Sequence, residues 1–213
     1  MLFRSLQTGV AAAGSQAESI TAASQKNFAE YIELLSIPNV PAEPADIRRN
    51  VEFLERSFAR RNFKTHRLDN AAGRPMILAE LNSNRSGAAT ILFYAHFDGQ
   101  PVINIEWSQQ DPFKPVVKQR DGQGAWQEVS RERLTASPFD PELRVFARSS
   151  SDDKAPIVML LTALDVLQAQ GKKLAINVKV LLDSEEEIGS PNLADVVDST
   201  NAPALADFWA AAL

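Results

Sequence analysis

Apolar residues recur at two spacings along this chain, and the spacing distinguishes predicted helices from predicted strands. A helical rhythm is present in three segments: Gln25–Ile37, which ends before Pro38, Ala45–Arg61 and Ala155–Gln170. In the first two, the apolar positions gather on one face, which predicts amphipathic helices. In the third, apolar residues lie on nearly every side, which predicts a helix largely buried against a sheet and closed by Gly171.

Four apolar segments have the pattern of strands. They are Lys64–Leu68, Met76–Leu81, Thr90–Ala95 and Leu174–Asp183. The last is apolar at almost every position, which is typical of a strand buried on both faces. A buried helix followed directly by such a strand forms half of an α/β layer. We therefore expect an α/β fold.

The remaining segments divide the chain. Residues from about 104 to 146 are polar and rich in proline, with a DGQG turn at Asp121–Gly124, so we expect a long insert that contains a hairpin. Short helices are predicted at Pro191–Asp198 and Ala204–Leu213. Polar residues interrupt the N-terminal apolar run, so residues 1–24 favour a flexible leader over a signal peptide, and a cytoplasmic over an exported protein.

Composition and charge exclude some classes of function. The 213 residues, 45% of them hydrophobic, suffice for one well-packed domain. A net charge of −5 with scattered Lys and Arg argues against nucleic-acid binding, and no apolar stretch reaches the roughly 18 residues of a membrane span. With no cysteine, any metal site must use carboxylates and the two histidines, His66 and His96.

A first polar cluster, YAHFDGQP, follows the apolar Thr90–Ala95 strand. Residues two apart in an extended chain face the same way, so His96 and Asp98 can project together. This arrangement suits a metal-bound imidazole whose second nitrogen is held by a carboxylate. A histidine merely paired with a neighbouring aspartate fits the pattern equally well.

Two acidic clusters lie at other element boundaries. Asp152 and Asp153 precede the buried helix, where helix capping alone would explain them. Four carboxylates, among them Glu185, Glu186 and Glu187, follow the buried strand; they repel one another unless they are solvated or neutralised by a cation. A solvated loop is the usual interpretation of such an acidic run, but sites of α/β sheets lie beyond the carboxyl ends of strands, which weakens that interpretation here.

Taken together, the three clusters supply one imidazole and several carboxylates. This set suits zinc, manganese or cobalt. Two such ions about 4 Å apart would activate a water and polarise a carbonyl. A neighbouring glutamate would then serve as general base.

The order and wording of the clusters resemble a known family. YAHFDGQP, WSQQDPFKPV at 107–116, RSSSDDKAP at 148–156 and EEEIGSP at 185–191 are similar to motifs of the zinc exopeptidase and amidohydrolase family of carnosinase, glutamate carboxypeptidase, acetylornithine deacetylase and succinyl-diaminopimelate desuccinylase. The resemblance covers roughly 25–213 and is nearest the dipeptidase branch. It implies a three-layer α/β domain with a mixed sheet between helices, incomplete at its C-terminus.

The resemblance also implies roles for individual residues. His96 would bind one zinc, with Asp98 orienting it; Asp152 would bridge two zinc ions, and Glu187 would bind the second. Glu186 would be the general base. The family further implies a cis peptide bond after Asp152 and a peptide or acyl-amino-acid substrate, and it is compatible with a homodimer of the full-length protein.

The chain departs from the family in several places. Ala147, Ser149 and Ala155 occupy positions that are usually glycine, and Asp183 and Ser184 stand where Glu and Gly are frequent. Family members are about twice as long and contribute a further carboxylate and a late histidine, which are not found here. We therefore expect the chain to be a truncated, inactive portion of a hydrolase. The alternatives are a non-catalytic module that binds a partner or a single metal, and an ordinary α/β protein with acidic loops.

Overall fold

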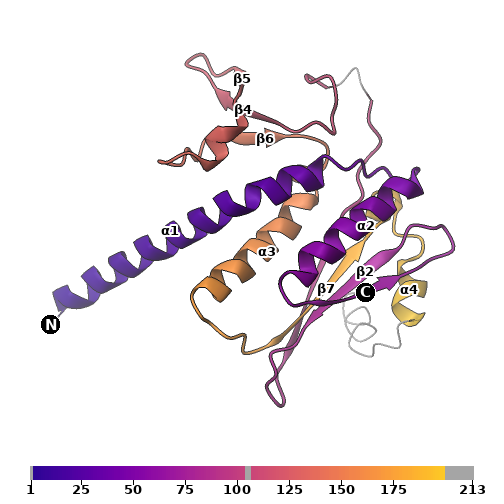
Figure 1. Ribbon diagram of the computed structural model, residues 1–213, viewed down its shortest axis with the longest axis horizontal. Helices are drawn as coiled ribbons and strands as arrows, with labels where there is room; N and C mark the ends of the chain where they lie inside the picture. Colours follow the sequence, from indigo (N-terminus) through magenta and orange to yellow (C-terminus); the bar gives the residue numbers. More distant parts are fainter. Residues whose placement is uncertain (1, 104–106, 200–213) are drawn as a thin grey trace.

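The computed structural model describes residues 2–103 and 107–199, and Figure 1 shows its arrangement. The helices are α1 (Leu2–Leu35), α2 (Pro44–Ala59), α3 (Lys154–Ala169) and α4 (Leu193–Ser199), with 3-10 turns η2 (Arg131–Thr135) and η3 (Glu186–Ile188). The strands are β1 (Lys64–Leu68), β2 (Met76–Leu81), β3 (Thr90–His96), β4 (Val116–Arg120), β5 (Trp126–Val129), β6 (Arg144–Phe146) and β7 (Asn177–Asp183).

The main sheet is mixed. Its four strands lie in the order β1-β2-β7-β3, with β3 parallel to β7 and the other neighbours antiparallel. Alternate residues of β2 point to opposite faces: Ile77 and Ala79 join one apolar cluster, whereas Met76 and Leu78 join another. Both faces of the central strands are therefore buried, as the pattern of the last predicted strand indicated.

Helices cover both faces of this sheet (Figure 1). On one face α1, α2 and α3 pack in the larger cluster, which includes Leu34, Val51 and Leu161. On the other face α4 packs through Leu193 and Val196. The predicted three-layer α/β fold with a mixed sheet is confirmed. None of the helices within the described residues is long and apolar enough to cross a membrane.

Helix α3 ends where the sequence predicts. Gly171 adopts a left-handed φ of 65°, its amide donates to Gln168, and the Lys172 amide donates to Leu167. These two bonds satisfy carbonyls of the last helical turn, in a Schellman arrangement for which glycine is favoured. The end of α3 thereby turns the chain toward β7.

Two segments differ from the expectation. The first helix begins at Leu2 rather than near Gln25, so residues 2–24, expected to be a flexible leader, are helical. The insert contains the expected hairpin, β4–β5, but it also forms a second sheet with β6 and buries Val117, Leu134 and Leu143 against α1. The helix predicted at Ala204–Leu213 lies outside the described residues.

Candidate metal centre

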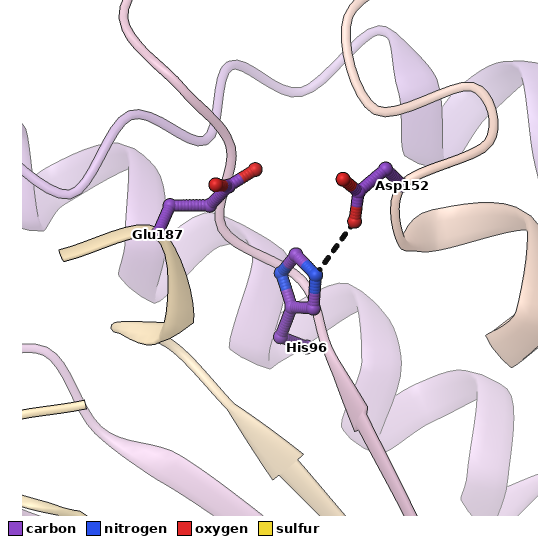
Figure 2. Close-up of side chains that lie close together, drawn as sticks. All are labelled: His96, Asp152 and Glu187. Carbon is purple, nitrogen blue, oxygen red and sulfur yellow. Dashed lines mark hydrogen bonds and ion pairs between the residues drawn. The ribbon is translucent and has the colours of Figure 1, made fainter. Parts of the chain in front are cut away.

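Three predicted ligands come together at one edge of the main sheet. His96 ends β3, Asp152 lies in the turn before α3, and Glu187 lies in η3 after β7 (Figure 2). Because β3 and β7 are parallel and His96 is in register with Asp183, their carboxyl ends meet at this edge. One donor atom from each of the three side chains lies within 4.8 Å of the others.

The imidazole of His96 is buried between two carboxylates. Its Nε2 lies 2.8 Å from Asp152 Oδ1, and its Nδ1 lies 3.3 Å from Asp98 Oδ1. Burial lowers the pKa of His96, but hydrogen bonds to Asp98 and Asp152 and the charges of Asp98 and Asp153 outweigh it and raise the pKa to about 9. The ring therefore stands in a strongly negative environment that favours a cation.

Asp98 is completely buried and binds both the imidazole of His96 and the backbone of η3. Besides its contact with His96, it accepts hydrogen bonds from the amides of Glu186 at 3.2 Å and Glu187 at 3.0 Å. A single carboxylate thus connects the end of β3 to η3. Removal of Asp98 would release both the imidazole and the loop that carries the two glutamates.

The turn before α3 contains the expected cis peptide bond between Asp152 and Asp153. The two neighbouring carboxylates point to different partners. Asp153 Oδ2 accepts a hydrogen bond from the His96 amide at 3.2 Å, whereas the Asp152 side chain is 76% exposed and reaches the imidazole. Asp153 therefore fixes the backbone of the turn, and Asp152 presents its carboxylate to the open side.

The acidic run divides into buried and open carboxylates. Asp183 is buried and accepts from Tyr94 and Ser190, and Glu185 is buried in an ion pair with Arg74, with Nε 2.6 Å from Oε1. The ion pair with Arg74 gives Glu185 a structural part in holding the loop.

Glu186 and Glu187 are the open members of the run. Glu186 Oε2 lies 3.8 Å from His96 Nε2, and Glu187 accepts a hydrogen bond from Gln100 Nε2 at 2.6 Å. Desolvation and the charges of neighbouring carboxylates raise the pKa of Glu186 despite the opposing effect of His96. A carboxyl with a raised pKa is better matched to accept and return a proton near neutral pH.

The donor set fits a divalent metal ion. Ligand atoms about 2.0–2.2 Å from a tetrahedral zinc ion lie about 3.3 Å apart, so donor atoms within 4.8 Å need only small side-chain movements to meet one. One imidazole with carboxylates also suits manganese or cobalt. His66, the other histidine, lies on β1 beside Glu80 at 3.3 Å and contributes nothing to this group.

The sequence did not reveal several residues that hold the site. Arg74 and Asn192 bind Glu185, Asn39 contacts two of the loops, and Lys154 reaches carbonyls at the end of α1. Gln100 and Lys154 carried a signal, because they lie inside the motifs YAHFDGQP and RSSSDDKAP. The others bind groups distant in sequence, which no local pattern indicates.

The sequence is similar to those of known peptidases. Residues 92–210 match the model of peptidase family M20/M25/M40. The chain is 27% identical over 124 residues to the human Beta-Ala-His dipeptidase and 27% identical over 123 residues to the Cys-Gly metallodipeptidase of Schizosaccharomyces pombe. Each alignment covers 58% of this chain but only 20% and 21% of those relatives, so the chain matches about one fifth of their length.

Solved structures share the fold. The di-peptidase Dug1p from Saccharomyces cerevisiae superposes with a TM-score of 0.65 at 18% identity, covering 87% of this chain and 37% of its own. Human carnosine dipeptidase 1 gives 0.63 at 21% identity, covering 85% and 37%. An M20 family metallo-carboxypeptidase from Sulfolobus solfataricus gives 0.62 at 27% identity, covering 81% and 34%.

Proposed function

The chain belongs to peptidase family M20/M25/M40, and from that premise we propose that it is part of a zinc-dependent hydrolase of the amide bond in small peptides or acyl-amino acids. The observation that carries the proposal is the convergence of His96, Asp152 and Glu187 donor atoms within 4.8 Å, with Glu186 beside them. The dipeptidases among the similar proteins favour a dipeptide substrate.

The proposed ligands have distinct parts. His96 and Asp152 would hold one ion, and Asp152 and Glu187 the second. Asp98 would keep the imidazole oriented through Nδ1, at the 3.3 Å separation described above. When bound, zinc polarises a scissile carbonyl and lowers the pKa of the attacking water.

Glu186 would act as the general base. Its carboxylate is 44% exposed and lies 3.8 Å from His96 Nε2, so it is open to solvent beside the proposed ligands. It would take a proton from the attacking water and pass it to the leaving amine. Substitution Glu186→Gln should therefore remove turnover while leaving zinc affinity nearly unchanged.

Zinc titration and hydrolysis assays test the proposal separately. The 213-residue chain should bind zinc, and His96→Ala should abolish tight binding. Hydrolysis of a dipeptide panel should be measured on this chain and on a longer form containing the rest of the family domain. We expect turnover from the longer form only; absence of zinc binding by the wild-type chain and of hydrolysis by the longer form would refute the proposal.

A non-catalytic, single-metal module is the second candidate. Within the described ranges 2–103 and 107–199, one group of three donors was found, which is a sufficient set for one ion. Elemental analysis of the longer form distinguishes the two. Two zinc ions per chain support the hydrolase, whereas a single ion together with no hydrolysis supports the module.

A further inference from the structure

Two of the proposed ligands lie on loops that are distant in sequence. We call residues 96–99 the His96 loop and residues 149–154 the Asp152 turn. The separation of these two backbones sets the distance between the His96 and Asp152 donor atoms. The connection between α1 and α2 contacts both loops through Asn39. It contributes no carboxylate or imidazole to the proposed metal group.

Asn39 contacts both loops at once. It is completely buried, and its Nδ2 donates to the Phe97 carbonyl at 2.6 Å and to Ser149 Oγ at 2.9 Å. The backbone carbonyl of Asn39 accepts a hydrogen bond from the Gly99 amide at 2.9 Å. Phe97 stands between His96 and Asp98, and Ser149 begins the Asp152 turn. One side chain therefore bridges the backbone of the His96 loop to the Asp152 turn.

The surrounding space is tight enough to make this contact specific. A Cβ at Gly99 would lie 2.5 Å from Ser149 Oγ and 3.0 Å from Asn39 Nδ2, so the approach requires glycine. Ser149 itself has a left-handed φ of 60°, at a position where the resembling family usually has glycine. Serine supplies there the hydroxyl that Asn39 binds, which glycine lacks.

Neighbouring contacts tie the same connection to the Asp152 turn. Lys154, fully buried, donates through Nζ to the carbonyls of Leu34 at 2.9 Å and Ile37 at 2.8 Å. Tyr31 Oη donates to the Ser150 carbonyl. The contacts of Lys154 and Tyr31 join the turn to α1 and to the connection after it, whereas Asn39 binds the turn and the His96 loop together.

We infer that Asn39 is a positioning residue that sets the spacing between the His96 loop and the Asp152 turn, and through it the affinity for the metal ion. The inference rests on the proposed metal site for its functional consequence. Its structural part, the coupling of two loops by one buried amide, can be measured in the metal-free chain.

The chain offers a matched control in Asn50 on α2. Asn50 is also completely buried, its Nδ2 also donates two hydrogen bonds, to the carbonyls of Pro38 and Asp46, and its Oδ1, like that of Asn39, has no hydrogen-bond partner. It supports the same connection without contacting either ligand loop. Asn39→Ala and Asn50→Ala therefore remove equivalent groups, and only the first removes the bridge.

Hydrogen exchange of the metal-free chain tests the bridge directly. Asn39→Ala should speed amide exchange in segments 93–103 and 147–154 together, whereas Asn50→Ala should speed it in α2 and leave both segments unchanged. If amide exchange in these two segments is the same in Asn39→Ala as in Asn50→Ala, the inference is overturned. This result does not depend on whether the chain binds zinc.

Zinc affinity, measured by competition with a chromogenic chelator, tests the consequence. Loss of groups that orient metal ligands typically costs about 10- to 100-fold in affinity, so we expect that range for Asn39→Ala and less than about threefold for Asn50→Ala. The cobalt-loaded absorption spectrum should change for the first variant alone. Equal losses in both variants would overturn the inference, whereas no zinc binding by wild type would instead contradict the proposed metal site of this chain.

Ser149→Ala provides a second, milder variant. It keeps the hydrogen bond between Asn39 and Phe97 and removes only the hydroxyl that Asn39 binds. If Asn39→Ala does not fold, Ser149→Ala can be compared with Asn50→Ala in its place. Ser149→Ala should weaken zinc binding, and the double variant should bind no more weakly than Asn39→Ala alone. If the two substitutions lower zinc affinity independently, so that their fold-losses multiply in the double variant, the inference of a shared bridge is overturned.

Discussion

Glu185 and Glu187 stand two positions apart in one acidic run, yet the structure gives opposite consequences for their removal. Glu185 has a fully buried side chain that pairs with Arg74 at 2.6 Å and accepts from the Asn192 side-chain amide at 2.8 and 3.1 Å. Glu187 is half-buried, and its side chain accepts a hydrogen bond from Gln100. The same substitution, Glu→Ala, can therefore be compared at the two positions.

The expected magnitudes follow from these surroundings. Glu185→Ala leaves the largely buried Arg74 guanidinium, 19% exposed, without its counter-ion, and breaking a buried pair typically costs about 3–5 kcal/mol. Glu187→Ala removes one charge from a group of like charges and should change the free energy of unfolding by less than about 1 kcal/mol. The loss of zinc affinity should follow the reverse order. Residues that only orient a metal ligand typically account for about 10- to 100-fold in affinity, and we expect Glu187→Ala, which removes a proposed ligand, to lose more than that.

Urea unfolding of the metal-free variants in EDTA measures the first quantity, and chelator competition measures the second. Arg74→Met serves as a control, because it should reproduce the stability loss of Glu185→Ala. The reasoning is wrong if Glu185→Ala is as stable as wild type, or if Glu187→Ala retains wild-type zinc affinity.

Three further outcomes are expected. The pKa of His96 in the folded chain is raised from 6.5 to about 9, so the protonated imidazole stabilises the metal-free chain fully below pH 6.5, and this stabilisation is lost as pH rises through 9. Urea unfolding across that pH range should show the loss for wild type. The His96→Gln variant should not show it. Zinc at about 100 times its Kd should stabilise wild type by about 2.7 kcal/mol and His96→Ala by almost nothing, measured by thermal unfolding. Gly171→Ala should cost about 1 kcal/mol or more, since φ is 65°, whereas Gly122→Ala, in an open turn, should be nearly neutral in the same assay.

The sequence predicted most of the main sheet and its helices, because their apolar spacing is strong and local. The strand at Met76–Leu81 and the helix at Ala155–Gln170 lie within one residue of their structural bounds. The start of α1 was missed because polar residues interrupt its apolar run, although Leu2, Leu6 and Val10 have helical spacing and the alanine-rich stretch Ala11–Ala13 favours helix by intrinsic propensity.

The candidate ligands were also predictable, since each lies in a motif at the end of an element. The supporting groups were not. Asn39 binds residues 58 and 110 positions away, and Arg74 binds Glu185 across 111 positions, so these contacts depend on how the layers pack. Local sequence therefore identified the side chains that converge at the proposed metal site, but tertiary packing determines what holds them.

Strand β3 has one neighbour, β7, among the described strands, and its other side is an open edge. The edge strand carries half-exposed Ile91 and Phe93 and ends at His96. Open apolar edges recruit further strands, either from the same protein or from other molecules. Self-association of this chain along β3 would therefore take place directly beside His96, a proposed metal ligand, so turbidity of a concentrated sample should respond both to zinc and to a charged substitution such as Ile91→Lys.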